Sequence, residues 1–385
     1  MKHLHPFISS GLQSVNRMVV KVGTHLLTHK SGGLNLDLMT QLVRQIATIR
    51  RRNIEVILVS SGAVGAGATI MGIEQPPEEL SQRQALAAIG QSQLIDLYEE
   101  RFHTYNLTVA QVLLTRDALD DRQRYLNIRN TLETLLQWGI IPIVNENDTV
   151  AVEELKFGDN DLLSAMIAVK IQADLLVILA DIDGLYDRPP SDKQAVRIPV
   201  VSDIDQAMAN VSEARGSTFS LGGMRSKLEA LRMAFQAGIL SHINNGRKPD
   251  VLLHILSGKN TGTWFKYQER KIKGRKLWLA FGKRIGDGKV IIDKGAEEAL
   301  LIGGKSLLPS GVTGVSGLFH KKDLIRVYNS EGKEIARGLV QFSSEEIAKI
   351  KGKQTSQIPG ILGQRDTYEV IHRNNLVTLD KGETP

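Results

Sequence analysis

Short apolar runs alternate with longer amphipathic segments through the first two thirds of the chain. The amphipathic segments place apolar side chains at helical spacing, as in Leu38, Leu42, Ile46 and Ile49, and again in Leu132, Leu135 and Leu136. The apolar runs are short, rich in Val and Ile, and end in Gly or polar residues, which is typical of buried strands. These predicted strands are 18–23, 56–62, 109–114, 140–148 and 175–181. Strand–helix alternation predicts an α/β fold: a three-layer sandwich with a mostly parallel central sheet covered on both faces.

The pattern changes after about residue 285. Runs at 289–293, 324–329 and 335–342 are separated by Gly-rich turns, which predicts a small β-rich domain with one or two short helices. We therefore expect a first domain over 1–265, a linker over 266–286 and a second domain over 287–385.

The positive charge of the chain is concentrated in the predicted linker. Residues 266–284 carry eight Lys or Arg against the single acid Glu269, so this segment holds +7 while the whole chain has a net charge of +6. Such a run is compatible with an RNA contact, and the nearby aromatics Trp264, Phe265, Tyr267 and Trp278 could stack on bases. A solvated linker, with its aromatics packed against the first domain, is the interpretation we favour.

Composition excludes several kinds of site. The chain has no cysteine, so disulfides, thiolate zinc sites and cysteine nucleophiles are ruled out. The apolar run 175–180 is too short to cross a bilayer, and polar residues interrupt the first twenty positions. We therefore expect a cytoplasmic protein that does not associate with membranes.

Polar or small residues follow four of the five predicted strands of the first domain, and two further polar segments open predicted helices. In parallel sheets the ligand site lies beyond the carboxyl ends of the strands, so these segments should share one site. Small residues, lysines and helix starts among them are suited to binding an anion such as phosphate. The segments are 21–24, 60–63, 145–148, 158–161, 181–183 and 222–227. Gly304-Lys305-Ser306 lacks the first glycine of a P-loop, and His25 with His29 lacks a third metal ligand, so we expect neither a P-loop nor a metal site.

Taken in order, KVGT, SSGAVGAG, LLTRDALDDRQRYLNIRNTL, PIVNENDTV, FGDNDLLSA and GGMRSK resemble the amino-acid kinase family, in its glutamate-phosphorylating branch. The tail from about residue 287 resembles a PUA domain, a small β-barrel that binds RNA in other proteins. The resemblance implies ATP-dependent phosphorylation of the γ-carboxylate of L-glutamate, the first step of proline biosynthesis. It also implies Mg²⁺ on the phosphates, feedback inhibition by L-proline and a homo-oligomer, and it leaves RNA binding by the tail open.

The resemblance also assigns roles to individual residues. Lys21 and Lys227 would flank the transferred phosphoryl group, and Asp161 would hold both lysines in place. Glutamate would be bound by Ser61, Gly62, Ala63, Asp148 and Asn160. The nucleotide would contact Lys21, Gly23, Ala180, Asp181, Leu221, Gly222, Gly223, Met224, Arg225, Ser226 and Lys227.

Three positions depart from the family pattern. His25 stands where the family has Ser, Ala180 where Thr is frequent, and Ser220-Leu221 where Gly-Thr is common. The last two changes remove hydroxyls that could touch the nucleotide, so we expect altered ATP affinity and an unchanged reaction. Two alternatives remain: a kinase for another amino acid or small acid, and an RNA-binding protein with a vestigial kinase domain. The presence of both lysines argues against the second.

Overall fold

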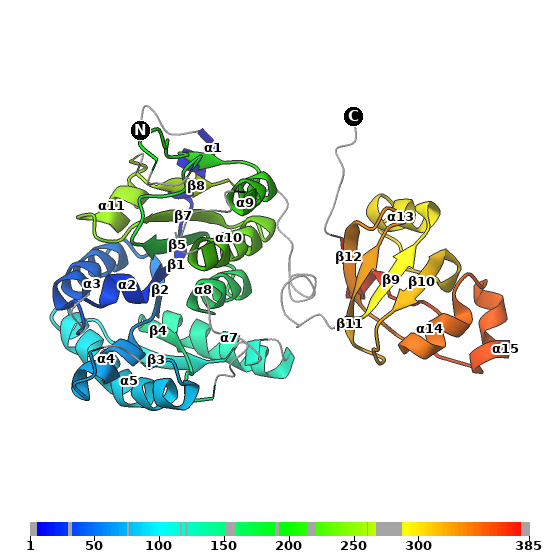
Figure 1. Ribbon diagram of the computed structural model, residues 1–385, viewed down its shortest axis with the longest axis horizontal. Helices are drawn as coiled ribbons and strands as arrows, with labels where there is room; N and C mark the ends of the chain where they lie inside the picture. The colour runs from blue at the N-terminus through cyan, green and yellow to red at the C-terminus, as the bar shows by residue number, and fades with distance from the viewer. Residues whose placement is uncertain are drawn as a thin grey trace. The chain divides into compact units, whose positions relative to one another are not determined.

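The computed structural model describes residues 6–29, 33–74, 77–115, 118–119, 122–150, 159–188, 192–213, 221–259, 261–266 and 287–378. The chain divides into two compact units, 1–271 and 272–385 (Figure 1). Of the predicted linker 266–286, only Lys266 lies within the described residues.

An eight-stranded sheet forms the centre of the first unit. Its order is β3-β4-β2-β1-β5-β7-β8-β6. The strands are β1 (Arg17–Val22), β2 (Glu55–Ser60), β3 (Val109–Leu114), β4 (Ile141–Glu146), β5 (Leu175–Ala180), β6 (Val200–Val201), β7 (Leu240–Asn245) and β8 (Thr263–Phe265). Neighbours from β3 to β7 pair in parallel, β8 pairs antiparallel with β7, and β6 pairs parallel with β8. The mostly parallel sheet predicted from the sequence is confirmed.

Helices cover both faces of this sheet (Figure 1). They are α1 (Pro6–Gln13), α2 (Thr24–Leu27), α3 (Leu36–Arg50), α4 (Ala63–Ile70), α5 (Leu80–His103), α7 (Arg122–Gln137), α8 (Asp159–Lys170), α9 (Ile204–Glu213), α10 (Leu221–Gln236) and α11 (Val251–Leu256). In Figure 1, α2, α3 and α11 lie on one side of the strands, and α8, α9 and α10 lie on the other. The buried side of α3, which includes Leu42, Ile46 and Ile49, is the side that its apolar spacing predicted.

Three strands of this sheet, β6, β7 and β8, were not predicted from the sequence. Strand β7 reads LSHINN, and its polar side chains Ser241, His242 and Asn244 are completely buried, so it lacks the apolar run that marks a central strand. Trp264 and Phe265 belong to β8 and are 0% exposed. The suggestion that these two aromatics form a surface for stacking RNA bases is therefore wrong, and Tyr267 and Trp278 lie outside the described residues.

The second unit contains a five-stranded mixed sheet with the order β10-β9-β11-β12-β13. Its strands are β9 (Lys289–Ile292), β10 (Val312–Ser316), β11 (Leu324–Tyr328), β12 (Glu334–Leu339) and β13 (Leu376–Thr378). Its α-helices are α13 (Lys294–Leu301), α14 (Ser344–Ile350) and α15 (Ile358–Leu362), with 3₁₀ turns at Pro309–Gly311, Thr355–Gln357 and Arg373–Asn375. A separate apolar core that includes Val290, Ile325 and Ile347 holds it together. The predicted β-rich domain is confirmed, with one more short helix than expected.

Candidate functional site

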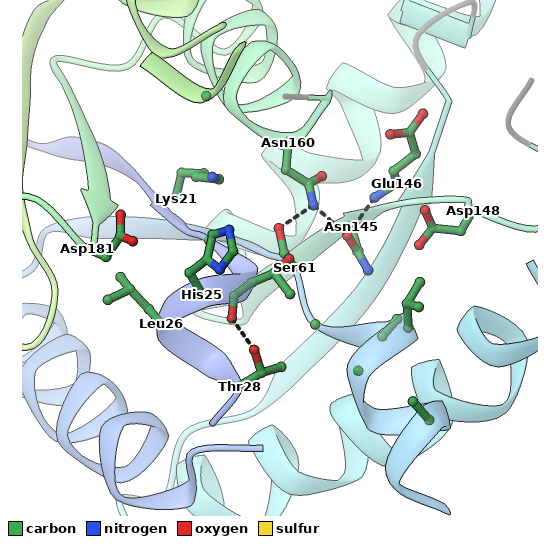
Figure 2. A pocket seen from close by; sticks show the side chains of 18 of the residues that line it. Lys21, His25, Leu26, Thr28, Ser61, Asn145, Glu146, Asp148, Asn160 and Asp181 are labelled. Carbon is green, nitrogen blue, oxygen red and sulfur yellow. Dashed lines mark hydrogen bonds between the residues drawn. The ribbon is translucent and has the colours of Figure 1, made fainter. Parts of the chain in front are cut away.

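A cleft of about 710 Å³ lies at the carboxyl ends of the central strands. Because β1, β2, β4 and β5 run in parallel, the residues that follow them meet at one edge of the sheet. Figure 2 shows Lys21 and Asp181 at one end of the cleft, Glu146 and Asp148 at the other, and Ser61 and Asn160 between them. The predicted site residues that line the cleft are Lys21, Gly23, Ser61, Gly62, Ala63, Asp148, Asn160, Asp161, Ala180, Asp181, Gly223, Ser226 and Lys227.

Two lysines from different elements meet on one carboxylate. Lys21 of β1 places its Nζ 2.6 Å from Oδ1 of Asp161, and Lys227 of α10 places its Nζ 3.1 Å from Oδ2. The hydroxyl of Ser226 donates to the same Oδ2 at 2.9 Å. The Asp161 side chain is 2% exposed and that of Lys21 7%, so this ion pair lies inside the protein, whereas Lys227 is 17% exposed at its border. Asp161, in the first turn of α8, thereby connects α8, β1 and α10.

The pKa values of this cluster reflect burial and mutual charge. Burial lowers the pKa of the Lys21 ammonium, and the Asp161 carboxylate opposes that change. Burial alone would raise the pKa of Asp161, but the positive charges of Lys21 and Lys227 hold it below its usual value. Asp161 is therefore a carboxylate at neutral pH. With both lysines charged, the cluster carries one net positive charge toward the cleft.

Hydrogen bonds connect the side chains in the middle of the cleft. Asn160 donates from Nδ2 to Oγ of Ser61 at 2.7 Å and to Oδ1 of Asn145 at 2.9 Å (Figure 2). Asn145, at the end of β4, is 3% exposed, and its Nδ2 donates to Oε1 of Gln91 on α5 at 2.8 Å. Strands β2 and β4 and helices α5 and α8 thus share one hydrogen-bonded chain of polar side chains.

The end of the cleft next to Lys21 offers space for phosphate groups. A side-chain carbon added at Gly23 would lie 3.2 Å from the Lys21 ammonium, so glycine at this position keeps space beside that cation. Ala180 and Asp181 line the same end after β5. These features fit a nucleoside triphosphate held by a lysine and by backbone amides.

Two residues predicted to contact the nucleotide, Met224 and Arg225, do not line the cleft. Leu221 and Gly222 lie outside the part of the chain whose side chains the structure describes. Arg225 is exposed and pairs with Glu229 one turn further along α10 at 3.1 Å. Because α10 begins at Leu221, only every third or fourth residue of its first turns faces the cleft, as Gly223, Ser226 and Lys227 do. The run 221–227 was predicted as a block, whereas helical geometry selects part of it.

Sequence reasoning also missed cleft residues. Asn145 and Glu146 belong to the NEND motif that drew attention to this region, yet only Asp148 was assigned a role. Thr24 and His25 line the cleft from α2, and Arg83 does so from α5. His29 lines it too, but the described parts of the chain contain no cluster of three side chains that could hold a metal ion. The position of Arg83 after an irregular loop left no pattern that could have identified it.

Within the described segments, no helix is long and apolar enough to cross a membrane. The model of the amino acid kinase family matches residues 16–245, and that of the PUA domain matches residues 288–362.

Among curated proteins, the chain is 48% identical to "Glutamate 5-kinase" of Caldanaerobacter subterraneus subsp. tengcongensis, across 95% of this chain and 99% of the relative. It is 47% identical to the protein of the same name from Geobacter sulfurreducens, across 96% and 99%. Among solved structures, the UMP kinase of Bacillus anthracis matches 66% of this chain and 96% of its own at 16% identity and a TM-score of 0.46.

Proposed function

This chain belongs to the amino acid kinase family, among its glutamate 5-kinase members, and from that membership we propose that it phosphorylates the side-chain carboxylate of L-glutamate with ATP. The product is γ-glutamyl phosphate, which makes the reaction the first step of proline biosynthesis. The observation that carries the proposal is the placement of two lysines on one buried carboxylate beside the cleft. We assign this activity to the domain over 1–265, and we regard 287–385 as a separate PUA domain.

The reaction needs cations more than it needs a base. A glutamate side chain has a pKa of about 4.3, so its γ-carboxylate is already ionised at neutral pH. One of its oxygens attacks the γ-phosphorus of ATP while the bond to the β-phosphate oxygen breaks and ADP leaves. Negative charge spreads over the transferred oxygens and the leaving group. Lys21 and Lys227 offset that charge, and Asp161 holds both ammonium groups in place.

Mg²⁺ neutralises part of the phosphate charge when it is bound. The described part of the chain holds no group of three or more side chains that could ligate a metal ion, so we place the ion on the phosphates of ATP. Nucleotide contacts come from Gly23, Ala180, Asp181, Gly223 and Ser226, which line the end of the cleft next to Lys21.

Glutamate occupies the middle of the cleft and the end that holds Asp148. Ser61, Gly62, Ala63 and Asn160 contact it, and the carboxylate of Asp148 pairs with its α-ammonium group. Proline carries a related ammonium and carboxylate, so it competes for the same residues as a feedback inhibitor.

The test is ADP formation by the purified protein with Mg·ATP and one amino acid at a time. We expect turnover that depends on L-glutamate, with the acyl phosphate trapped by hydroxylamine as the hydroxamate. Aspartate and N-acetylglutamate represent the other kinases of this family. Equal or faster turnover with either of them would replace the proposed substrate.

A further inference from the structure

Gln91 does not line the cleft, but it is hydrogen-bonded to Asn145, which does. It is half-buried on α5, and its Oε1 accepts a hydrogen bond from Nδ2 of the buried Asn145 at 2.8 Å. We propose that Gln91 is a positioning residue for the amino acid substrate, acting through Asn145 and Asn160 on the hydroxyl of Ser61. This inference rests on the proposed function, because it concerns how the same site recognises glutamate.

One backbone group fixes the orientation of each asparagine amide in this series of hydrogen bonds. The backbone N–H of Glu146 can only donate, so the Asn145 side-chain atom 2.9 Å away must be the oxygen Oδ1. That oxygen can only accept, so the atom of Asn160 that approaches it at 2.9 Å must be the amide nitrogen Nδ2. The remaining nitrogen of Asn145 then needs an acceptor, which Gln91 provides. Each of these three hydrogen bonds thus pairs a donor with an acceptor.

Ser61 connects this series of hydrogen bonds to the substrate. The amide nitrogen of Asn160 also donates to Oγ of Ser61 at 2.7 Å, so the serine oxygen accepts there. The serine proton must then point elsewhere, and Ser61 lies on the wall of the cleft. A hydroxyl whose proton is directed into the cleft binds a carboxylate oxygen of the substrate better than one that is free to rotate. Gln91 therefore helps to keep Ser61 a donor.

Helix α5 is held close enough for this contact. A side-chain carbon at Gly90 would lie 2.0 Å from the carbonyl oxygen of Ala63, and one at Gly67 would lie 1.9 Å from that of Leu86, so α4 and α5 touch backbone to backbone. Seven residues after Gln91, the Tyr98 hydroxyl is 2.9 Å from Oγ of Ser60, at the end of β2. Positions 91 and 98 lie on the same side of a helix. The helix thus has two polar contacts, one to the end of β4 and one to the end of β2.

The test compares Gln91→Met, which keeps length and helix propensity but removes the acceptor, with Gln93→Met two residues further along the same helix. For Gln91→Met we expect the KM for glutamate to rise roughly five- to tenfold, the size of one hydrogen bond, with kcat and the KM for ATP within about twofold. Gln93→Met should leave all three constants near those of the wild type. Gln91→Glu retains an acceptor oxygen, so its KM for glutamate should stay within about threefold.

A double-mutant cycle separates positioning from general stability. In a Ser61→Ala background the effect of Gln91→Met on the KM for glutamate should shrink to less than about twofold, because the group that it positions is gone. An undiminished effect, an equal rise in the KM for ATP, or an equal loss in Gln91→Glu would overturn the inference. Wild-type protein without glutamate-dependent ADP formation would instead refute the proposed function.

Discussion

Replacing Asp161 by Asn tests how the two lysines are held. Asn keeps the size of the side chain but removes the negative charge that lies 2.6 Å from one ammonium and 3.1 Å from the other. Removing one partner of a buried ion pair costs about 3–5 kcal/mol of stability. Loss of one preorganised contact to a transition state lowers kcat by roughly a hundred- to a thousandfold. We expect both effects, since Asp161 is almost completely buried and Lys21 depends on it.

The pH dependence of this variant gives a second signature. Burial already lowers the pKa of Lys21, and Asp161 counteracts that decrease. Without the carboxylate the pKa of Lys21 falls further, so this lysine loses its proton at a lower pH than it does in the wild type. Because the protonated form stabilises the transition state, kcat of Asp161→Asn should rise as the pH is lowered from about 9 to about 6.5.

The assay is steady-state kinetics between these pH values, with folding checked by circular dichroism and thermal unfolding. Asp183→Asn is the matched control. Asp183 also follows β5 and pairs with a lysine, Lys248, at 3.1 Å, but both side chains are more than a third exposed. Its loss should cost less than about 1 kcal/mol and leave kcat within about twofold. A folded Asp161→Asn protein with a kcat near that of the wild type would refute the reasoning.

Four further predictions concern the cleft, the second unit and the pH dependence of stability. Lys227→Ala should lower kcat roughly a hundredfold or more with small changes in either KM, because its charge acts in the transition state; near-normal kcat in steady-state assays would contradict this. Asp148→Asn should raise the KM for glutamate roughly ten- to a hundredfold and leave the KM for ATP within about threefold. The inhibition constant for proline should rise in parallel, and unchanged constants would refute the contact between Asp148 and the α-ammonium group. A chain ending at residue 286 should keep glutamate-dependent ADP formation, and a folded but inactive truncation would show that the second unit takes part in catalysis. Burial lowers the pKa of His242 to about 3 from 6.5, so unfolded but not folded chains bind a proton below pH 6.5. The unfolding free energy should therefore fall by about 2 kcal/mol between pH 7 and pH 5 from this residue alone. Denaturant titrations at several pH values should show that the unfolding free energy of His242→Gln falls less steeply as the pH is lowered.

The fold was predictable where burial is reflected in apolar runs. Strand β5 has six consecutive apolar residues, and its predicted core coincided with the observed strand. Strand β7 was missed because the cost of burying His242 and Asn244 is met by a hydrogen bond between them and by another from Asn244 to Thr261 at 3.0 Å. Those partners are visible only in the folded chain. Strand β8, three residues long, is too short to show any period.

The site was predictable where a motif follows a strand. Lys21 stands out because it ends an apolar strand, and Asp161 because it opens an apolar helix; the fold brings the two together. Gln91 had no such signal, since it lies in the middle of a long helix and reaches its partner 54 residues away. In the first turns of α10, the sequence could not say which residues face the cleft, because that depends on how the helix is rotated about its axis.

The contact between α4 and α5 has a consequence for engineering this enzyme. At Gly67 and Gly90 the two helices leave no room for even one methyl group, since the opposing atoms belong to the backbone and cannot rotate away. Alanine at either position would have to push the helices apart, and α5 carries Gln91. Libraries that aim to change the accepted amino acid can vary side chains that line the cleft, such as that of Arg83. They should keep both glycines, because even alanine at Gly67 or Gly90 would displace α5 and with it the wall of the amino acid pocket.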